Sequence, residues 1–147
     1  MSDWCLGVLG GSGLATIDGL EEAAWVECDT PWGRPSDAIR VGRLNGTRIA
    51  FLPRHGRHHS IPPADVNARA NIAALKQLGC TDLISLSAVG SLKEDLAPGR
   101  FVVVDQYIDR TVSRPATFFE PGIVAHVSLA DPVCPRLSGL ALAAGRT

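Results

Sequence analysis

The sequence has 147 residues, of which 46% are apolar and 20% charged, and its net charge is −1. This composition is ordinary for a globular protein of one domain, and the charge balance excludes the basic surface expected of proteins that bind nucleic acid or anionic membranes. The first residues lack a secretory signal, and no apolar stretch approaches the roughly 18 residues that span a bilayer. The four cysteines are scattered, which fits neither a disulfide framework nor a zinc ribbon, so we expect a cytoplasmic protein.

The first third of the chain predicts four strands. An apolar run over residues 5–9 stops at the glycine-rich turn 10–13, which is typical of a buried strand that enters a tight turn. Further strand patterns cover residues 24–28, 39–44 and 48–52. Asn45-Gly46 separates the last two and predicts a hairpin between them.

The remainder alternates helix and strand patterns. The predicted elements are a helix over 64–78, a strand over 82–89, a strand over 101–104 and a helix over 135–144. Strand, helix and strand in this order form a βαβ unit. The sequence therefore predicts an α/β fold, with a mixed central β-sheet and flanking helices.

Three of the predicted strands end in residues that suit a small oxyanion. Gly10 to Gly13 can point backbone N–H groups at an anion, and Ser12 adds a hydroxyl donor. Arg54 offers the planar fork that phosphate prefers, and His55 can donate from either ring nitrogen. Ser87 ends the third strand among small residues. Each feature alone is equally compatible with a tight turn, a solvated loop or simple packing, but together they favour a site for a small tetrahedral oxyanion.

A metal site is the competing interpretation of the histidines at 55, 58 and 59. No Asp, Glu or Cys lies in the same loop, and Arg54 and Arg57 would repel a cation. We therefore predict no metal.

Several longer segments resemble the methylthioadenosine phosphorylases, a family within the purine-nucleoside phosphorylases. The glycine turn of residues 10–14 is shared widely among nucleoside phosphorylases, whereas two other segments are more specific to this family: 105–111 and 130–135. The remaining segments that carry the resemblance are 29–37, 54–59, 67–71 and 87–92.

The resemblance implies a nucleoside-phosphorylase fold, a homotrimer, and roles for individual residues. The phosphate-binding residues that it implies are Ser12, Arg54, His55, Ser87 and Ala88. Ala88 would also line the substrate pocket, and His126 would reach the sugar pocket of a neighbouring subunit. From the sequence pattern alone, His126 is equally a surface or packed histidine.

The implied activity is that of a pentosyltransferase, which converts 5′-methylthioadenosine and phosphate into adenine and 5-methylthioribose 1-phosphate in purine and methionine salvage. Phosphate is then a co-substrate, and the implied reaction needs no cofactor. Family members are roughly twice as long, so we expect residues 1–147 to form the N-terminal portion of a single phosphorylase domain. The half that supplies the base contacts is then absent, and no catalytic residue is identified. The alternatives left open are a methylthioinosine or inosine/guanosine phosphorylase, and a non-catalytic oligomerisation or interaction module.

Overall fold

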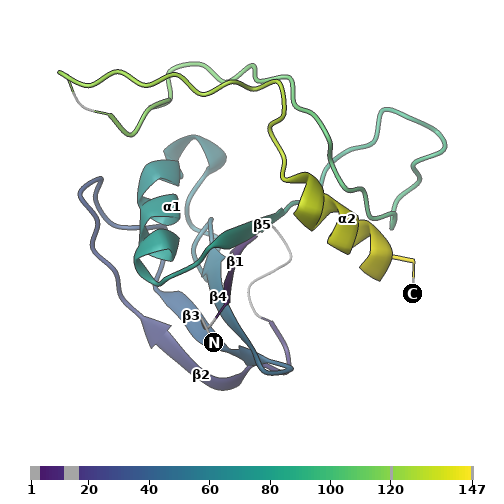
Figure 1. Cartoon of the computed structure of the whole chain (residues 1–147), viewed down its shortest axis with the longest axis horizontal. Coiled ribbons are helices and arrows are strands. Elements are labelled where there is room, and N and C mark those ends of the chain that lie inside the picture. Colours follow the sequence, from purple (N-terminus) through teal and green to yellow (C-terminus); the bar gives the residue numbers. More distant parts are fainter. Residues whose placement is uncertain (1–3, 12–16, 120, 147) are drawn as a thin grey trace. The chain divides into compact units, whose positions relative to one another are not determined.

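The computed structural model describes residues 4–11, 17–119 and 121–146. The chain divides into two compact units, Met1–Val89 and Gly90–Thr147, which are described separately below. All five strands and the helix α1 belong to the first unit (Figure 1).

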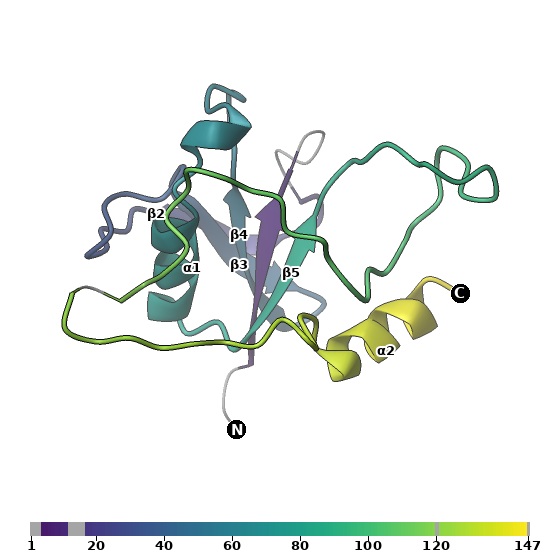
Figure 2. The same cartoon turned by 90° about the horizontal axis from the view of Figure 1, so that it is seen from above.

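The first unit contains a mixed five-stranded sheet with the strand order β2-β3-β4-β1-β5. Its strands are β1 (Cys5–Gly10), β2 (Glu21–Val26), β3 (Ile39–Leu44), β4 (Thr47–Pro53) and β5 (Asp82–Leu86). β1 lies between β4 and β5 and pairs in parallel with both, whereas β3 pairs antiparallel with β2 and β4 (Figure 2). The prediction of a mixed α/β sheet is confirmed.

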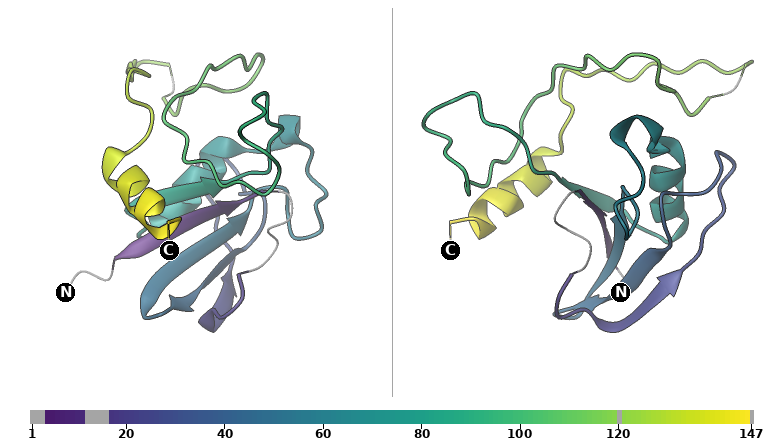
Figure 3. Two further views of the ribbon diagram at one scale, coloured as in Figure 1. Left: turned by 90° about the vertical axis from the view of Figure 1, so that its right-hand side faces the viewer. Right: turned by 180° about the vertical axis from the view of Figure 1, so that it is seen from behind.

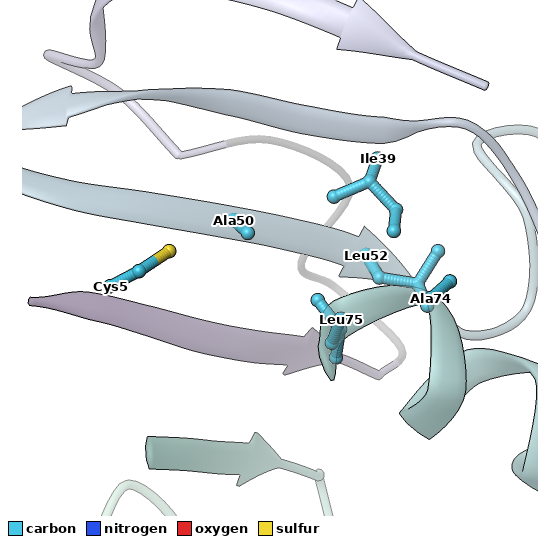
Figure 4. Close-up of a cluster of buried hydrophobic side chains, with 6 residues drawn as sticks. All are labelled: Cys5, Ile39, Ala50, Leu52, Ala74 and Leu75. Carbon is cyan, nitrogen blue, oxygen red and sulfur yellow. The ribbon is translucent and has the colours of Figure 1, made fainter. Parts of the chain in front are cut away.

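Alternating side chains of the strands form two apolar clusters, one on each face of the sheet. One cluster joins Ala74 and Leu75 of α1 to the buried side chains of Cys5, Ile39, Ala50 and Leu52 (Figure 4). The other contains Val8, Ile49 and Phe51, with Ile17 and Leu20 packed against them. This period of two explains why β4 is buried on both faces and lies at the centre of the unit.

The helix α1 (Ala68–Gln77) begins four residues later than the predicted start at 64. Two consecutive prolines precede it, and the short 3-10 helix Pro63–Asp65 ends at Val66, whose extended backbone interrupts the helical path. Asn67 then caps α1, because its side-chain oxygen accepts a hydrogen bond from the N–H of Ala70 at 3.1 Å. Figure 3 shows α1 alongside the sheet from two further directions.

The second unit has little regular structure among its described residues. Its one assigned element there is the helix α2 (Pro135–Ala144), as predicted. The strand predicted over 101–104 is wrong, because these residues pair with no strand in the part of the chain that the structure describes. Two other strands were predicted too far along the chain: the 24–28 strand lies at Glu21–Val26, and the 82–89 strand ends at Leu86. No helix in the described residues is long and apolar enough to cross a membrane.

Candidate functional site

The carboxyl ends of three parallel strands meet at one edge of the sheet. In the parallel register, Gly10 at the end of β1 is paired with Pro53 of β4 on one side and with Leu86 of β5 on the other. The residues that follow these ends therefore emerge next to one another, which is where open α/β sheets bind ligands. Among them are Gly11, Arg54 and Ser87, each at a position that the sequence predicted.

Arg54 connects all three strand ends. Its backbone N–H donates to the carbonyl of Gly10 at 3.0 Å. Its Nη1 donates to the hydroxyl oxygen of Ser87 at 2.8 Å and to the carbonyl of Leu86 at 3.2 Å. Because the Ser87 oxygen accepts from Arg54, the hydrogen of that hydroxyl remains available for a further acceptor.

Gly11 gives the Arg54 side chain the space that it occupies. A Cβ atom at Gly11 would lie 2.7 Å from Nη2 of Arg54 and 2.8 Å from the carbonyl oxygen of Leu86. These distances are too short for any carbon side chain, and the Leu86 oxygen belongs to the backbone of a paired strand. The glycine is thus required because the guanidinium passes closely over the end of β1.

His55 orients Arg54 from the other side. Its side chain is buried, with Nδ1 2.9 Å from the carbonyl of Ile61, and its Nε2 accepts a hydrogen bond from Nε of Arg54 at 3.2 Å. The tautomer that satisfies both contacts is neutral and carries its proton on Nδ1. In this arrangement the imidazole positions the guanidinium and offers no N–H of its own to an anion, which differs from the expectation that either ring nitrogen could donate.

The charge of Arg54 is not neutralised by a carboxylate anywhere in residues 4–11, 17–119 and 121–146. Its hydrogen-bond partners in the described residues are all neutral groups, whereas Arg57 and Arg34 form ion pairs with Asp37 and Asp29. A guanidinium held by a backbone carbonyl, a hydroxyl and an imidazole, with no carboxylate partner in the described residues, is an arrangement that attracts a small oxyanion.

The other predicted site residues have different outcomes. Ser12 lies outside the described residues. Ala88 is exposed directly after Ser87, and His126 is exposed in the second unit. The described residues contain no group of three or more metal-ligating side chains. Phosphate binding by these residues, and the role of His126 toward a neighbouring subunit, stay predictions.

Sequence reasoning missed the role of Asp37 and the close contact of Gly11 with Arg54. The turn of residues 10–13 was predicted to direct backbone N–H groups at an anion, and the place of Gly11 directly after a strand could also have indicated a close contact. Asp37 stood inside the 29–37 segment without an assigned role, and no local signal connects it with the Arg54 loop, because its partner Arg57 is 20 residues away.

The model of one protein family, the phosphorylase superfamily, matches residues 6–147. A relative named S-methyl-5′-thioadenosine phosphorylase from Cereibacter sphaeroides is 60% identical over 96% of this chain, and one of the same name from Nitrosopumilus maritimus is 54% identical over 90%. The matched regions cover 49% and 50% of those relatives. The chain thus spans about half the length of the curated relatives it matches.

Solved structures give the same result. A methylthioadenosine phosphorylase from an antarctic soil metagenomic library is 48% identical to this chain, with a TM-score of 0.90 over 97% of the chain and 50% of that protein. The methylthioadenosine phosphorylase from Schistosoma mansoni, solved in complex with adenine, is 40% identical with a TM-score of 0.90, over 97% of this chain and 53% of its own.

Proposed function

We propose that this chain, which belongs to the phosphorylase superfamily, holds inorganic phosphate for the phosphorolysis of a purine nucleoside, 5′-methylthioadenosine. The observation that carries the proposal is the placement of Arg54, which has no carboxylate partner among the described residues, at the meeting point of three strand ends. The relatives named S-methyl-5′-thioadenosine phosphorylase support the choice of substrate.

The reaction that we propose is a displacement at the anomeric carbon of the sugar. A phosphate oxygen forms the new C–O bond while the glycosidic C–N bond breaks, and the purine leaves with the bonding electron pair and takes up a proton. Such glycosyl transfers pass through an oxocarbenium-like state, so a fixed phosphate serves as nucleophile and as a nearby negative charge. The task of Arg54 and Ser87 is to hold the anion in place, which removes the entropy cost of bringing two reactants together.

The proposal also covers the need for cofactors, the oligomeric state and the cellular location. Phosphate is a co-substrate, and the reaction needs neither metal nor organic cofactor. We propose a homotrimer in which His126 reaches the sugar pocket of a neighbouring subunit, with Ala88 and Ser12 completing the phosphate and substrate contacts. The proposed location is the cytoplasm.

Phosphate binding to the 147-residue chain tests the site. We expect Arg54→Ala to weaken binding by about 1.5–3 kcal/mol, as is usual for the loss of a charge-assisted hydrogen bond. Arg34→Ala, which removes an arginine from an exposed ion pair, is the matched control and should leave phosphate binding unchanged. Equal phosphate affinity in the Arg54→Ala chain, measured by calorimetry, would contradict the assignment.

Substrate choice is tested by joining this chain to the C-terminal half of the Cereibacter sphaeroides relative. Phosphate-dependent release of the base is then followed with 5′-methylthioadenosine, 5′-methylthioinosine and inosine. We expect release of adenine from the first to be fastest. Faster release of hypoxanthine from either 6-oxo substrate would favour the alternative phosphorylases.

A further inference from the structure

We infer that Asp37 is a positioning residue for the phosphate site, because through Arg57 it fixes the loop that carries Arg54 and His55. The inference rests on the proposed function and assigns a role to a side chain that lies outside the site itself. It is carried by a set of contacts between this loop and the segment before β3.

The carboxylate of Asp37 binds both the main chain and the side chain of Arg57. One oxygen, Oδ2, accepts from the backbone N–H of Arg57 at 2.6 Å, and Nε of Arg57 lies 3.0 and 3.1 Å from the two carboxylate oxygens. Nη2 completes the ion pair at 2.9 Å from Oδ1. Asp37 therefore fixes the backbone of Arg57 as well as its guanidinium. An ion pair between the ends of two surface side chains leaves the backbone free.

This ion pair is less exposed to solvent than the pair of Asp29 with Arg34. The side chain of Asp37 is 14% exposed and that of Arg57 40%, whereas Asp29 and Arg34, in the other ion pair, are 81% and 83% exposed. The guanidinium of Arg57 also lies over the ring of Trp25, 4.3 Å from its centroid. Shielding strengthens an ion pair, and the aromatic face adds a cation–π contact. These contacts on two sides of its guanidinium fix the position of Arg57 relative to Asp37.

The loop that it holds is closed on itself by short hydrogen bonds. The N–H of Gly56 donates to the carbonyl of Pro53 at 2.9 Å, in a turn that needs the positive φ of 76° at Gly56. The N–H of Ile61 donates to the carbonyl of His55 at 3.1 Å, and the ring of His55 returns a contact to the carbonyl of Ile61. A displacement of Arg57 would therefore move His55, and the contact of His55 with Arg54 would move with it.

Asp37 is itself anchored to the core of the first unit. The neighbouring Ser36 is bound twice by Asn71, through its backbone N–H at 2.8 Å and through its hydroxyl at 3.0 Å. Asn71 is 1% exposed within α1. The N–H of Ala38 donates to Oδ1 of Asp37 at 2.8 Å and sets the carboxylate orientation. The chain of contacts runs from the buried helix to Asp37, from Asp37 to Arg57, and from the loop to Arg54.

The test compares phosphate dissociation constants of 147-residue variants, measured by calorimetry well below each variant's thermal midpoint. We expect Asp37→Asn to weaken phosphate binding about tenfold, since a misplaced contact group costs one to two orders of magnitude, and Asp37→Glu to recover part of the loss. Asp29→Asn is the matched control and should bind phosphate like the unmodified chain. A role in stability alone would lower the midpoint and leave the dissociation constant unchanged.

Arg57→Lys gives a second, independent variant, because it keeps the charge and loses the fork that binds Asp37. We expect it to weaken phosphate binding severalfold, and the double variant with Asp37→Asn to be no weaker than the worse single one. If folded Asp37→Asn and Arg57→Lys chains bind phosphate as tightly as the unmodified chain, the inference is overturned and the proposed function is left standing. A failure of the unmodified chain to bind phosphate would overturn both.

Discussion

The two units of the chain differ in how they bury their apolar side chains. Among the described residues, the buried hydrophobic side chains all belong to the first unit, between Cys5 and Leu75. In the second unit Phe101, Ile108 and Val127 are 97%, 90% and 87% exposed, and α2 has no buried residue. The first unit therefore forms its own core, and the described part of the second does not.

The difference shows that family similarity and local folding are separate properties of a sequence. The phosphorylase superfamily matches residues 6–147, which includes both units. Among the described residues, only the first unit has segments that pair as strands, and three of them, β1, β3 and β4, contribute side chains to its apolar clusters. Pairing matters because the backbone groups of a strand need partners, and the clusters stabilise the sheet by burying apolar surface.

The largest expected effect comes from truncating one phenylalanine in each unit. Phe51 is fully buried in the central strand β4, so Phe51→Ala should lower the free energy of unfolding by about 3–5 kcal/mol. Phe101 is almost fully exposed, and Phe101→Ala should change it by no more than about 0.5 kcal/mol. Urea unfolding measures both, and similar losses would show that the second unit has a core in solution.

A smaller effect is expected from adding one methyl group in each unit. Gly11→Ala places a carbon within 3 Å of both Arg54 and the backbone of β5, and should cost about 1–3 kcal/mol of unfolding free energy as well as weaken phosphate binding. Gly139→Ala is the matched control in α2, where nothing lies within 4 Å of the added carbon. Its effect should be neutral or slightly stabilising, because alanine favours the helix. Phosphate affinity unchanged by Gly11→Ala would contradict the close contact.

The strands of the first unit could be predicted because their signals are local. Apolar runs that stop at glycine, together with Asn45-Gly46 between two of them, identified β1, β3 and β4 to within a residue or two. The same type of apolar run at 101–104 gave a wrong prediction, since a run of valines says nothing about whether a partner strand lies beside it. The start of α1 was missed for a local reason, the two prolines and the extended Val66.

The site could be predicted in part. The sequence placed Arg54 and Ser87 at strand ends, and the parallel register then brought them within 2.8 Å. The tautomer of His55 and the ion pair of Asp37 with Arg57 could not be predicted, because both depend on contacts between segments that come together only in the folded chain. The residues expected to contact the phosphate lie in turns after strands, which the sequence pattern reveals. The residues that position them are far away in the sequence and cannot be recognised from it.

The smallest expected effect concerns one carboxyl group in each unit. Burial alone would raise the pKa of Asp37, but hydrogen bonds from Arg57 and from the Ala38 N–H more than offset this and hold it below the usual value. Hydrogen bonds from the N–H and hydroxyl of Thr111 likewise lower the pKa of Asp109. The partner Arg57 is 20 residues from Asp37 and meets it only in the folded state, whereas Thr111 is two residues from Asp109 and can form the same bonds in the unfolded chain.

The sign of the pH dependence follows from these lowered values. A carboxyl group whose pKa falls on folding contributes stability above its unfolded pKa of about 3.9, and this stability is lost as the pH falls through the lower folded value. Asp37→Asn should therefore reduce the thermal midpoint at pH 7, and the difference from the unmodified chain should shrink as the pH falls below about 4. Asp109→Asn, the matched variant in the second unit, should change the midpoint less and with little dependence on pH. Calorimetric scans between neutral pH and about pH 2.5 measure both, and a larger pH-dependent loss for Asp109→Asn would mean that the second unit, and not the first, holds its carboxylate by tertiary contacts.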